Sequence, residues 1–215
     1  MFFVNNILAV IGIVGGLLCA IADLLLDLKG PNNIKNGIID SEWENMSHWR
    51  FVISGILAMF AVPMYSCGFV ALMNKMTESY QLFPGVLSAI FLIGAMGGFM
   101  IHIFLCLQPT IYQKLSVRSE RELAKELIYD LFAQIYIPFF TLYCMLVIVP
   151  SIVVMGLIIN GILILPIWCL ALNPLVFQLL GLLLRRTGLK IFIDAPSCCA
   201  ASLGMAMYGV LALMV

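Results

Sequence analysis

Positive charge alternates along this chain between the two sides of a series of apolar stretches. Ten of the eleven Lys and Arg residues fall in three short segments, and six apolar stretches separate these from segments that hold almost no basic residue. The basic segments contain Lys29, Lys35 and Arg50; Lys114, Arg118, Arg121 and Lys125; and Arg185, Arg186 and Lys190. The opposite side has only Lys75. Because short loops rich in Lys and Arg stay in the cytoplasm, the pattern predicts six membrane spans with both termini outside the cytoplasm.

Composition supports the same class. Hydrophobic residues make up 63% of the chain and charged residues only 10%, whereas roughly 25% of the residues of a soluble domain are charged. We therefore predict an all-α, polytopic integral membrane protein, multi-pass in a bacterial inner membrane, whose residues 1–215 form one bundle with little structure outside the bilayer. The predicted spans, each near the length of about 20 residues that a bilayer requires, are 4–28, 51–73, 83–107, 128–159, 163–184 and 190–215.

The fourth span is predicted to begin outside the bilayer. Ser119 and Glu122 have the spacing of a capping box, and the helical pattern continues from there to Asn160, on the order of 60 Å at about 1.5 Å per residue. Pro138 is expected to kink this helix. The boundary with the fifth span is open, because the sequence has no charge between Met145 and Leu172. A five-span alternative would place the last basic loop on the wrong side.

Three ionisable residues are expected to share one depth in the membrane. Asp23, His102 and Asp194 each lie four or five residues from the basic end of a predicted span. A charged group at the centre of a membrane helix costs at least about 2.5 to 3.5 kcal/mol, so such positions indicate function. Asp23 also ends a stripe of small residues on one helical face, which includes Gly12 and Gly16, and small residues line contacts between membrane helices. The polar layer is therefore predicted to face the bundle interior.

His102 is the natural acid or base of such a layer, since its unperturbed pKa is near 6.5. Asp23 or Asp194 is predicted to orient it, and all three are candidate catalytic residues. The candidate substrate-binding residues are Gln134, Tyr65, Tyr136, Asn173, Glu44 and His48. Alternatives remain open for several of these positions. Aspartates near the membrane surface can reach water, Asp194 can cap the last helix, and Glu44 and His48 belong to a loop whose tryptophans can anchor it at the interface or cover a pocket.

Three short segments carry a resemblance to a known family. GIVGGLLCAIADLLLD at residues 12–27, GAMGGFMIH at residues 94–102 and LNPLVFQLLG at residues 172–181 resemble an uncharacterised bacterial family of six-span membrane proteins. That family has no assigned activity. The resemblance implies that Asp23, His102 and Asn173 belong to the family's pattern.

Three functions are compatible with these features, and whether the protein is an enzyme stays open. The first is a small intramembrane enzyme that does acid–base chemistry on a lipid or isoprenoid-like substrate, in a pocket open to the cytoplasmic side or inner leaflet. The second is a proton-coupled transporter or exporter subunit, and the third a non-catalytic lipid-binding or assembly protein. No metal, cofactor or nucleic acid is expected, because the other histidine is remote and the charges are balanced. The expected partner is a membrane lipid or hydrophobic small molecule, and homo-oligomerisation stays open.

Overall fold

The computed structural model describes residues 2–30, 32–76, 82–189 and 195–215, and most of them are helical. In chain order the α-helices are α1 (Phe2–Asp27), α2 (Trp49–Met73), α3 (Leu82–Ser116), α4 (Arg121–Tyr143), α5 (Val149–Ile159), α6 (Pro174–Arg186) and α7 (Ala195–Met214). A two-stranded antiparallel hairpin, β1 (Lys35–Asn36) and β2 (Ile39–Asp40), lies between α1 and α2. Short 3-10 helices occupy Ser41–Glu44 and Ile167–Ala171, and a π-helical segment occupies Cys144–Ile148. The predicted all-helical class is confirmed.

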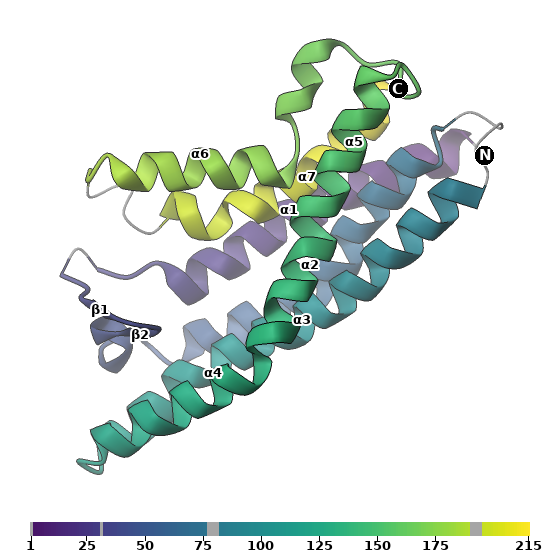
Figure 1. The fold of residues 1–215 in the computed structure, drawn as a ribbon. Coiled ribbons are helices and arrows are strands. Elements are labelled where there is room, and N and C mark those ends of the chain that lie inside the picture. Colours follow the sequence, from purple (N-terminus) through teal and green to yellow (C-terminus); the bar gives the residue numbers. More distant parts are fainter. Residues whose placement is uncertain (1, 31, 77–81, 190–194) are drawn as a thin grey trace.

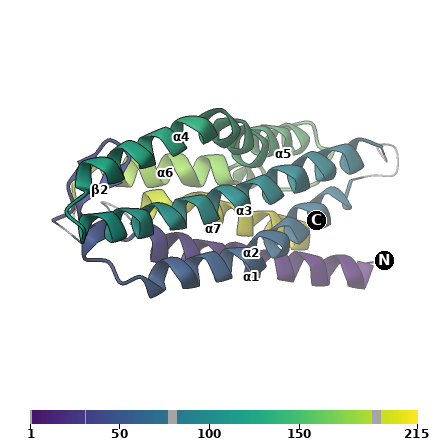
Figure 2. The same ribbon diagram turned by 90° about the horizontal axis from the view of Figure 1, so that it is seen from below.

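The two ends of the bundle differ in what they carry. Figure 1 shows both termini at one end and the β hairpin, the start of α4 and the end of α6 at the other. Figure 2 shows α1 and α2 on one side of the bundle, α4, α5 and α6 on the opposite side, and α3 and α7 between them. We call the end formed by residues 28–30, 32–48, 114–125 and 182–186 the basic end, and the other the terminal end.

Four helical stretches are long and apolar enough to cross a membrane. They are Phe3–Asp27, Trp49–Met73, Leu82–Ser116 and Arg121–Ile159, and Cys198–Met214 of α7 is a shorter apolar helix. Such sequences are helical in lipid because the backbone N–H and C=O groups find no water there and must bond within the segment. These helices are compatible with the predicted integral membrane protein.

Helix α3 is longer than predicted and supports a small packed region at the basic end. We expected its span to end at residue 107, but α3 accommodates Pro109 and continues to Ser116, about 13 Å further. Its last turns pack against the loop that follows α1: the rings of Trp43 and Tyr112 meet edge to face at 6.0 Å, and the Gln113 amide donates to the Trp43 carbonyl at 2.7 Å. More of the chain is therefore folded beyond the apolar spans than the sequence suggested.

The long fourth helical stretch is confirmed, but its predicted start is wrong. Arg121–Ile159 forms 39 continuous helical residues. Ser119, expected to cap this helix together with Glu122, instead has a left-handed φ of 63° in the turn from α3. Glu120 takes the N-cap position without a side-chain cap bond. The Ser-x-x-Glu spacing was present, but the tight turn between two antiparallel helices determines the backbone at this position.

The same helix departs from α geometry at a different place from the one expected. Pro138 lies inside α4, and the hydrogen-bonding pattern widens to that of a π-helix at Cys144–Ile148, immediately before α5, where Pro150 cannot donate a backbone hydrogen bond. Single π-helical turns occur often at functional sites, because the extra residue redirects side chains. Here the segment brings Leu146 and Val147 into the bundle interior.

The fifth predicted span, 163–184, is not one continuous helix. The chain turns at Gly161, where φ is +69°, and continues through a 3-10 helix before α6 begins at Pro174. Asn173 caps α6, which has 13 residues and a length of about 20 Å, less than the hydrocarbon core of about 30 Å. The physical reason is the pair of prolines: Pro166 lacks the N–H that a helix through it would need, and Pro174 suits a first helical turn.

Glycines let the backbones touch in the half of the bundle nearest the termini. A Cβ at Gly12 of α1 would collide with the backbone of Gly68 in α2, and one at Gly209 of α7 would collide with the carbonyl of Ala9. Stacked aromatic rings lie beside this contact. The cluster consists of Tyr65, Phe69, Phe91 and Tyr208, with 4.2 Å between the stacked rings of Phe69 and Phe91. This half is closely packed, as the predicted small-residue stripe on α1 requires.

Candidate functional site

The structure brings together the two residues that the sequence placed at one depth. Asp23, near the end of α1, and His102, late in α3, face each other across the bundle, with 3.6 Å between the aspartate Oδ1 and the histidine Nδ1. Their side chains are 18% and 12% exposed, respectively. This distance is within ion-pair range but longer than a good hydrogen bond. A small movement would therefore bring the two groups into direct proton-transfer contact.

Two serine hydroxyls contact the atoms of this pair that do not face each other, Oδ2 of Asp23 and Nε2 of His102. The Ser202 hydroxyl of α7 donates to Oδ2 of Asp23 at 2.6 Å, so the carboxylate has a different neighbour at each oxygen. The Ser54 hydroxyl of α2 donates to the Ala22 carbonyl at 2.8 Å and lies 2.9 Å from Nε2 of His102. A hydroxyl has one hydrogen, and Ser54 directs it to a carbonyl, which can only accept. Nε2 of His102 must then be the donor to Ser54.

This tautomer determines where a proton can reside. With Nε2 protonated, Nδ1 of a neutral His102 would present a lone pair to Oδ1 of Asp23, and two acceptors would face each other in a low-dielectric site. One proton on either group relieves this repulsion. The geometry is therefore suited to a single proton shared by the two groups. No group of three His, Cys, Asp or Glu side chains suited to a metal ion occurs in the described part of the chain.

The pair lies in the wall of a cavity of about 310 Å³. Side chains from α1, α2, α3, α4, α6, α7 and the π-helical segment line it. The apolar wall includes Val62, Leu105, Phe139, Leu142, Leu146 and Met205. Asp23, His102 and Ser202 form a polar patch on this wall, and the buried Tyr65 lies at the side of the aromatic cluster. An apolar space with a few polar groups is typical of small-molecule sites.

A second, polar cavity of about 210 Å³ adjoins the first at the basic end. Both are lined by Asp27, Gln178 and Cys198. The Lys29 ammonium lies 2.9 Å from Oδ1 of Asp27 and 3.0 Å from Oδ2 of Asp40, with 7% of its side chain exposed. Burial alone would lower the pKa of Lys29, but the two carboxylates outweigh it and raise the pKa above its ordinary value. Lys29 therefore stays charged at neutral pH.

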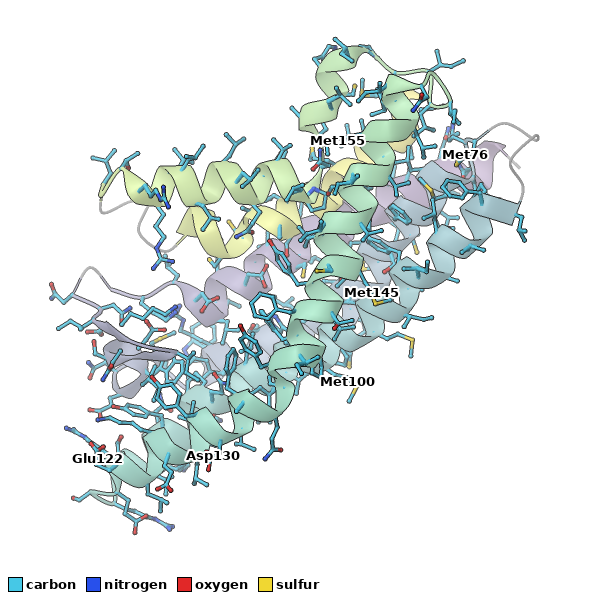
Figure 3. All side chains as sticks on the ribbon, in the orientation of Figure 1. Met76, Met100, Glu122, Asp130, Met145 and Met155 are labelled. Carbon is cyan, nitrogen blue, oxygen red and sulfur yellow. The ribbon has the colours of Figure 1, made fainter. Side chains whose placement is uncertain are left out.

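Other predicted site residues lie elsewhere. Gln134 and Tyr136 of α4 are both exposed, with Tyr136 50% exposed, and the lining of the apolar cavity includes neither. Asp130, one turn before Gln134, is exposed on the same helix (Figure 3). Asn173 is buried at the start of α6, where Oδ1 accepts from the Val176 N–H at 3.0 Å, so the structure gives it a capping contact.

The acidic and aromatic loop before α2 forms its own surface feature. Glu44 pairs with Arg121 at 3.0 Å, and Nδ1 of His48 lies 3.4 Å from the Thr110 hydroxyl. Both line a separate groove beside the last turns of α3, and neither is among the residues that line the apolar cavity. The structure does not bring them to Asp23. Asp194 lies outside the described residues.

Sequence reasoning missed three contributions to the site. Ser202 of α7 was not among the candidate site residues, and its contact with Asp23, 179 residues away in the chain, depends on packing. Ser54 of α2 was likewise not among the candidate site residues, although its hydroxyl lies 2.9 Å from Nε2 of His102. The wall formed by Leu146 and Val147 depends on the π-helical turn, for which the apolar sequence holds no signal other than Pro150.

Comparison with known proteins is consistent with the resemblance seen in the sequence. No curated protein and no solved structure matches this chain. A family of unknown function, DUF6796, matches over residues 1–215. Since the match covers its whole length, the chain belongs to the DUF6796 family.

Proposed function

We propose that this protein is an intramembrane enzyme that transfers a proton to and from a lipid or isoprenoid-like substrate. The observation that carries the proposal is the Asp23–His102 pair, whose Oδ1 and Nδ1 face each other at 3.6 Å in the wall of a largely apolar cavity. In the proposed step the pair removes a proton from one substrate atom and returns it to another. Isomerisation and cyclisation of an unsaturated chain follow this balance and need no co-reactant.

The shape of the cavity favours an enzyme over a carrier. A carrier requires a polar path that reaches both membrane faces in turn. Towards the terminal end the cavity meets Tyr65, whose ring contacts Phe91, and the aromatic cluster and the Gly12–Gly68 backbone contact follow. Towards the basic end it adjoins the polar cavity. A site with access from one end suits a substrate that enters and leaves on the same side.

The orientation is part of the proposal. The basic end would face the cytoplasm, because short loops rich in Lys and Arg remain there, and both termini would lie outside it. The chain would then cross a bacterial inner membrane six times, with the irregular segment 162–173 and α6 together making the fifth crossing. Non-helical backbone at membrane depth is tolerated where protein buries it, and the capped, buried Asn173 is consistent with this arrangement.

The test begins with the lipid that the protein itself selects. The full chain is purified in nanodiscs made from native membrane, its bound lipids are identified by mass spectrometry, and each is incubated with fresh protein and analysed for a product of equal or changed mass. The same incubation in deuterated water reports proton exchange even where an isomerisation reverses. We expect product or exchange with the native chain and its loss in Asp23→Asn and in His102→Gln.

A matched variant tests whether a loss of turnover comes from the Asp23–His102 pair or only from the removal of one negative charge. Asp130→Asn removes one carboxylate from the exposed face of α4 and should leave turnover unchanged. If Asp23→Asn and His102→Gln retain full turnover, the proposal is wrong. It is also wrong if lipids bind to the native chain without product or deuterium exchange, because the protein would then be a lipid-binding component rather than an enzyme.

A further inference from the structure

We propose that the two adjoining cavities form one site for a single-chain amphiphile with a phosphate headgroup. This inference rests on the proposed function and names its substrate class. The hydrocarbon chain would lie in the apolar cavity beside Asp23 and His102, and the phosphate in the polar cavity at the basic end. The argument comes from the continuity of the cavities, the charges around the second one and the volume of the first.

Continuity follows from the shared lining. Asp27 of α1, Gln178 of α6 and Cys198 of α7 each line both cavities, so three helices form a common rim between them. Beyond the rim the lining changes from apolar side chains to Lys29, Lys35 and Arg185. A molecule that crosses the rim must therefore be apolar at one end and polar at the other.

The charges around the polar cavity favour an anion. Asp27 and the buried Asp40 both pair with Lys29, and these three groups together carry one excess negative charge. Lys35 and Arg185 come from the β hairpin and the last turn of α6, and no ion pair of either occurs among the described residues. Lys35 and Arg185 bring the formal charge of the cavity lining to +1. Two such cations in a small polar cavity suit a phosphate, which accepts several charge-assisted hydrogen bonds at once.

The volume of the apolar cavity limits the hydrocarbon part. A dry cavity of about 150 Å³ holds one benzene molecule, so about 310 Å³ corresponds to on the order of a dozen carbon atoms. That is room for one moderate chain rather than the two long chains of a typical bilayer phospholipid. Together the two cavities fall within the range of about 300–1,000 Å³ that small-molecule sites occupy.

The test measures binding of defined probes to the full chain by native mass spectrometry. Dodecyl phosphate carries both features, dodecanol lacks the phosphate, and inorganic phosphate lacks the chain. We expect dodecyl phosphate to bind most tightly. The double variant Lys35→Gln with Arg185→Gln should weaken its binding by about tenfold or more while leaving dodecanol binding unchanged. The control double variant Arg118→Gln with Arg186→Gln removes the same charge from exposed positions outside both cavities and should bind like the native chain.

Each other outcome overturns the inference. If dodecyl phosphate and dodecanol bind equally well, the polar cavity does not recognise phosphate. If inorganic phosphate binds as tightly as dodecyl phosphate, the site is one for free phosphate. If both double variants lose dodecyl phosphate binding equally, the binding depends on the overall positive charge of the protein rather than on Lys35 and Arg185. The binding result is independent of turnover, since Asp23→Asn should lose turnover and still bind dodecyl phosphate. If the native chain binds dodecyl phosphate but shows no turnover, only the enzyme proposal is wrong. If the native chain shows turnover but does not bind dodecyl phosphate, only the headgroup inference is wrong.

Discussion

The same three helices behave differently in the two halves of the bundle. Towards the termini, α1, α2 and α7 meet at Gly12, Gly68 and Gly209, where there is no space for even one added carbon. About three turns further along α1, the neighbours of Asp23 are a cavity, a serine hydroxyl and a histidine that is not in direct contact. The chain has thus placed its close packing in one half and its polar, incompletely filled space in the other.

This contrast suggests that the terminal half mainly stabilises the bundle and that the half at the basic end holds the proposed site. Glycine contacts and aromatic rings fix the helix axes in the terminal half, so the helix ends beside the cavity are held at a set spacing without having to fill it. A site needs such rigid support if its groups are to keep their geometry around an empty space. Substitutions in the two halves should consequently have opposite signatures, one on unfolding and the other on turnover.

The largest expected effect belongs to the shared-proton pair. Asp23→Asn and His102→Gln should each lower turnover by about 10²- to 10⁴-fold, because each removes one holder of the proton. The double variant should be no worse than the single variants, since the two groups act as a unit. The measurement is the rate of product formation from the identified lipid, beside thermal unfolding in the same nanodiscs. Multiplied losses in the double variant would show two independent roles instead.

The next effect should appear in the opposite half and in unfolding. Gly12→Leu places a side chain against the backbone of Gly68 and should lower the free energy of unfolding by about 3 kcal/mol, the upper part of the usual range for overpacking. Gly156→Leu is the control, because a Cβ at Gly156 of α5 meets nothing within 4 Å. Denaturant unfolding followed by tryptophan fluorescence compares the two. Equal stability would mean that the glycine contact does not fix the helices.

Much of this division could be predicted from the sequence. The small-residue stripe on α1 predicted the contact at Gly12, and counting residues from the basic end placed Asp23 and His102 at one depth. Both arguments depend on fixed helical geometry, which makes them reliable over a few turns. The partners of these residues could not be predicted, since Ser202 is 179 residues from Asp23 in the chain and only packing brings it near.

A smaller effect is expected where a residue only positions the pair. Ser202→Ala removes the hydroxyl that donates to Oδ2 of Asp23 and should lower turnover by about tenfold, equivalent to about 1.4 kcal/mol, with a shifted pH profile as the carboxylate loses a stabilising donor. Ser66→Ala is the control: its hydroxyl is equally buried but donates only to the Val62 carbonyl of its own helix. If both variants shift the pH profile alike, Ser202 has no specific role.

The fifth predicted span, residues 163–184, is the part of the fold that the sequence predicted least well. Residues 163–184 carry no charge and are mostly apolar, so their hydropathy predicted a continuous span, and hydropathy is insensitive to where a helix starts. Asn173 and Pro174 together formed a helix-start signal, but Asn173 was predicted to bind substrate. Local chemistry at two positions thus outweighed an apolar pattern of more than twenty residues.

The smallest effect tests that helix start and the wall it supports. Asn173→Ala should lower stability by about 1 kcal/mol, because the Val176 N–H loses its acceptor and the Leu170 carbonyl its donor at a buried position. Asn160→Ala, which removes a bond to the Gly156 carbonyl at the exposed end of α5, is the control and should change stability less. Hydrogen exchange should quicken at the first turn of α6 in Asn173→Ala alone. Since Gln178 on α6 lines both cavities, fraying of this helix should also weaken dodecyl phosphate binding, and unchanged exchange would mean that packing rather than the cap fixes α6.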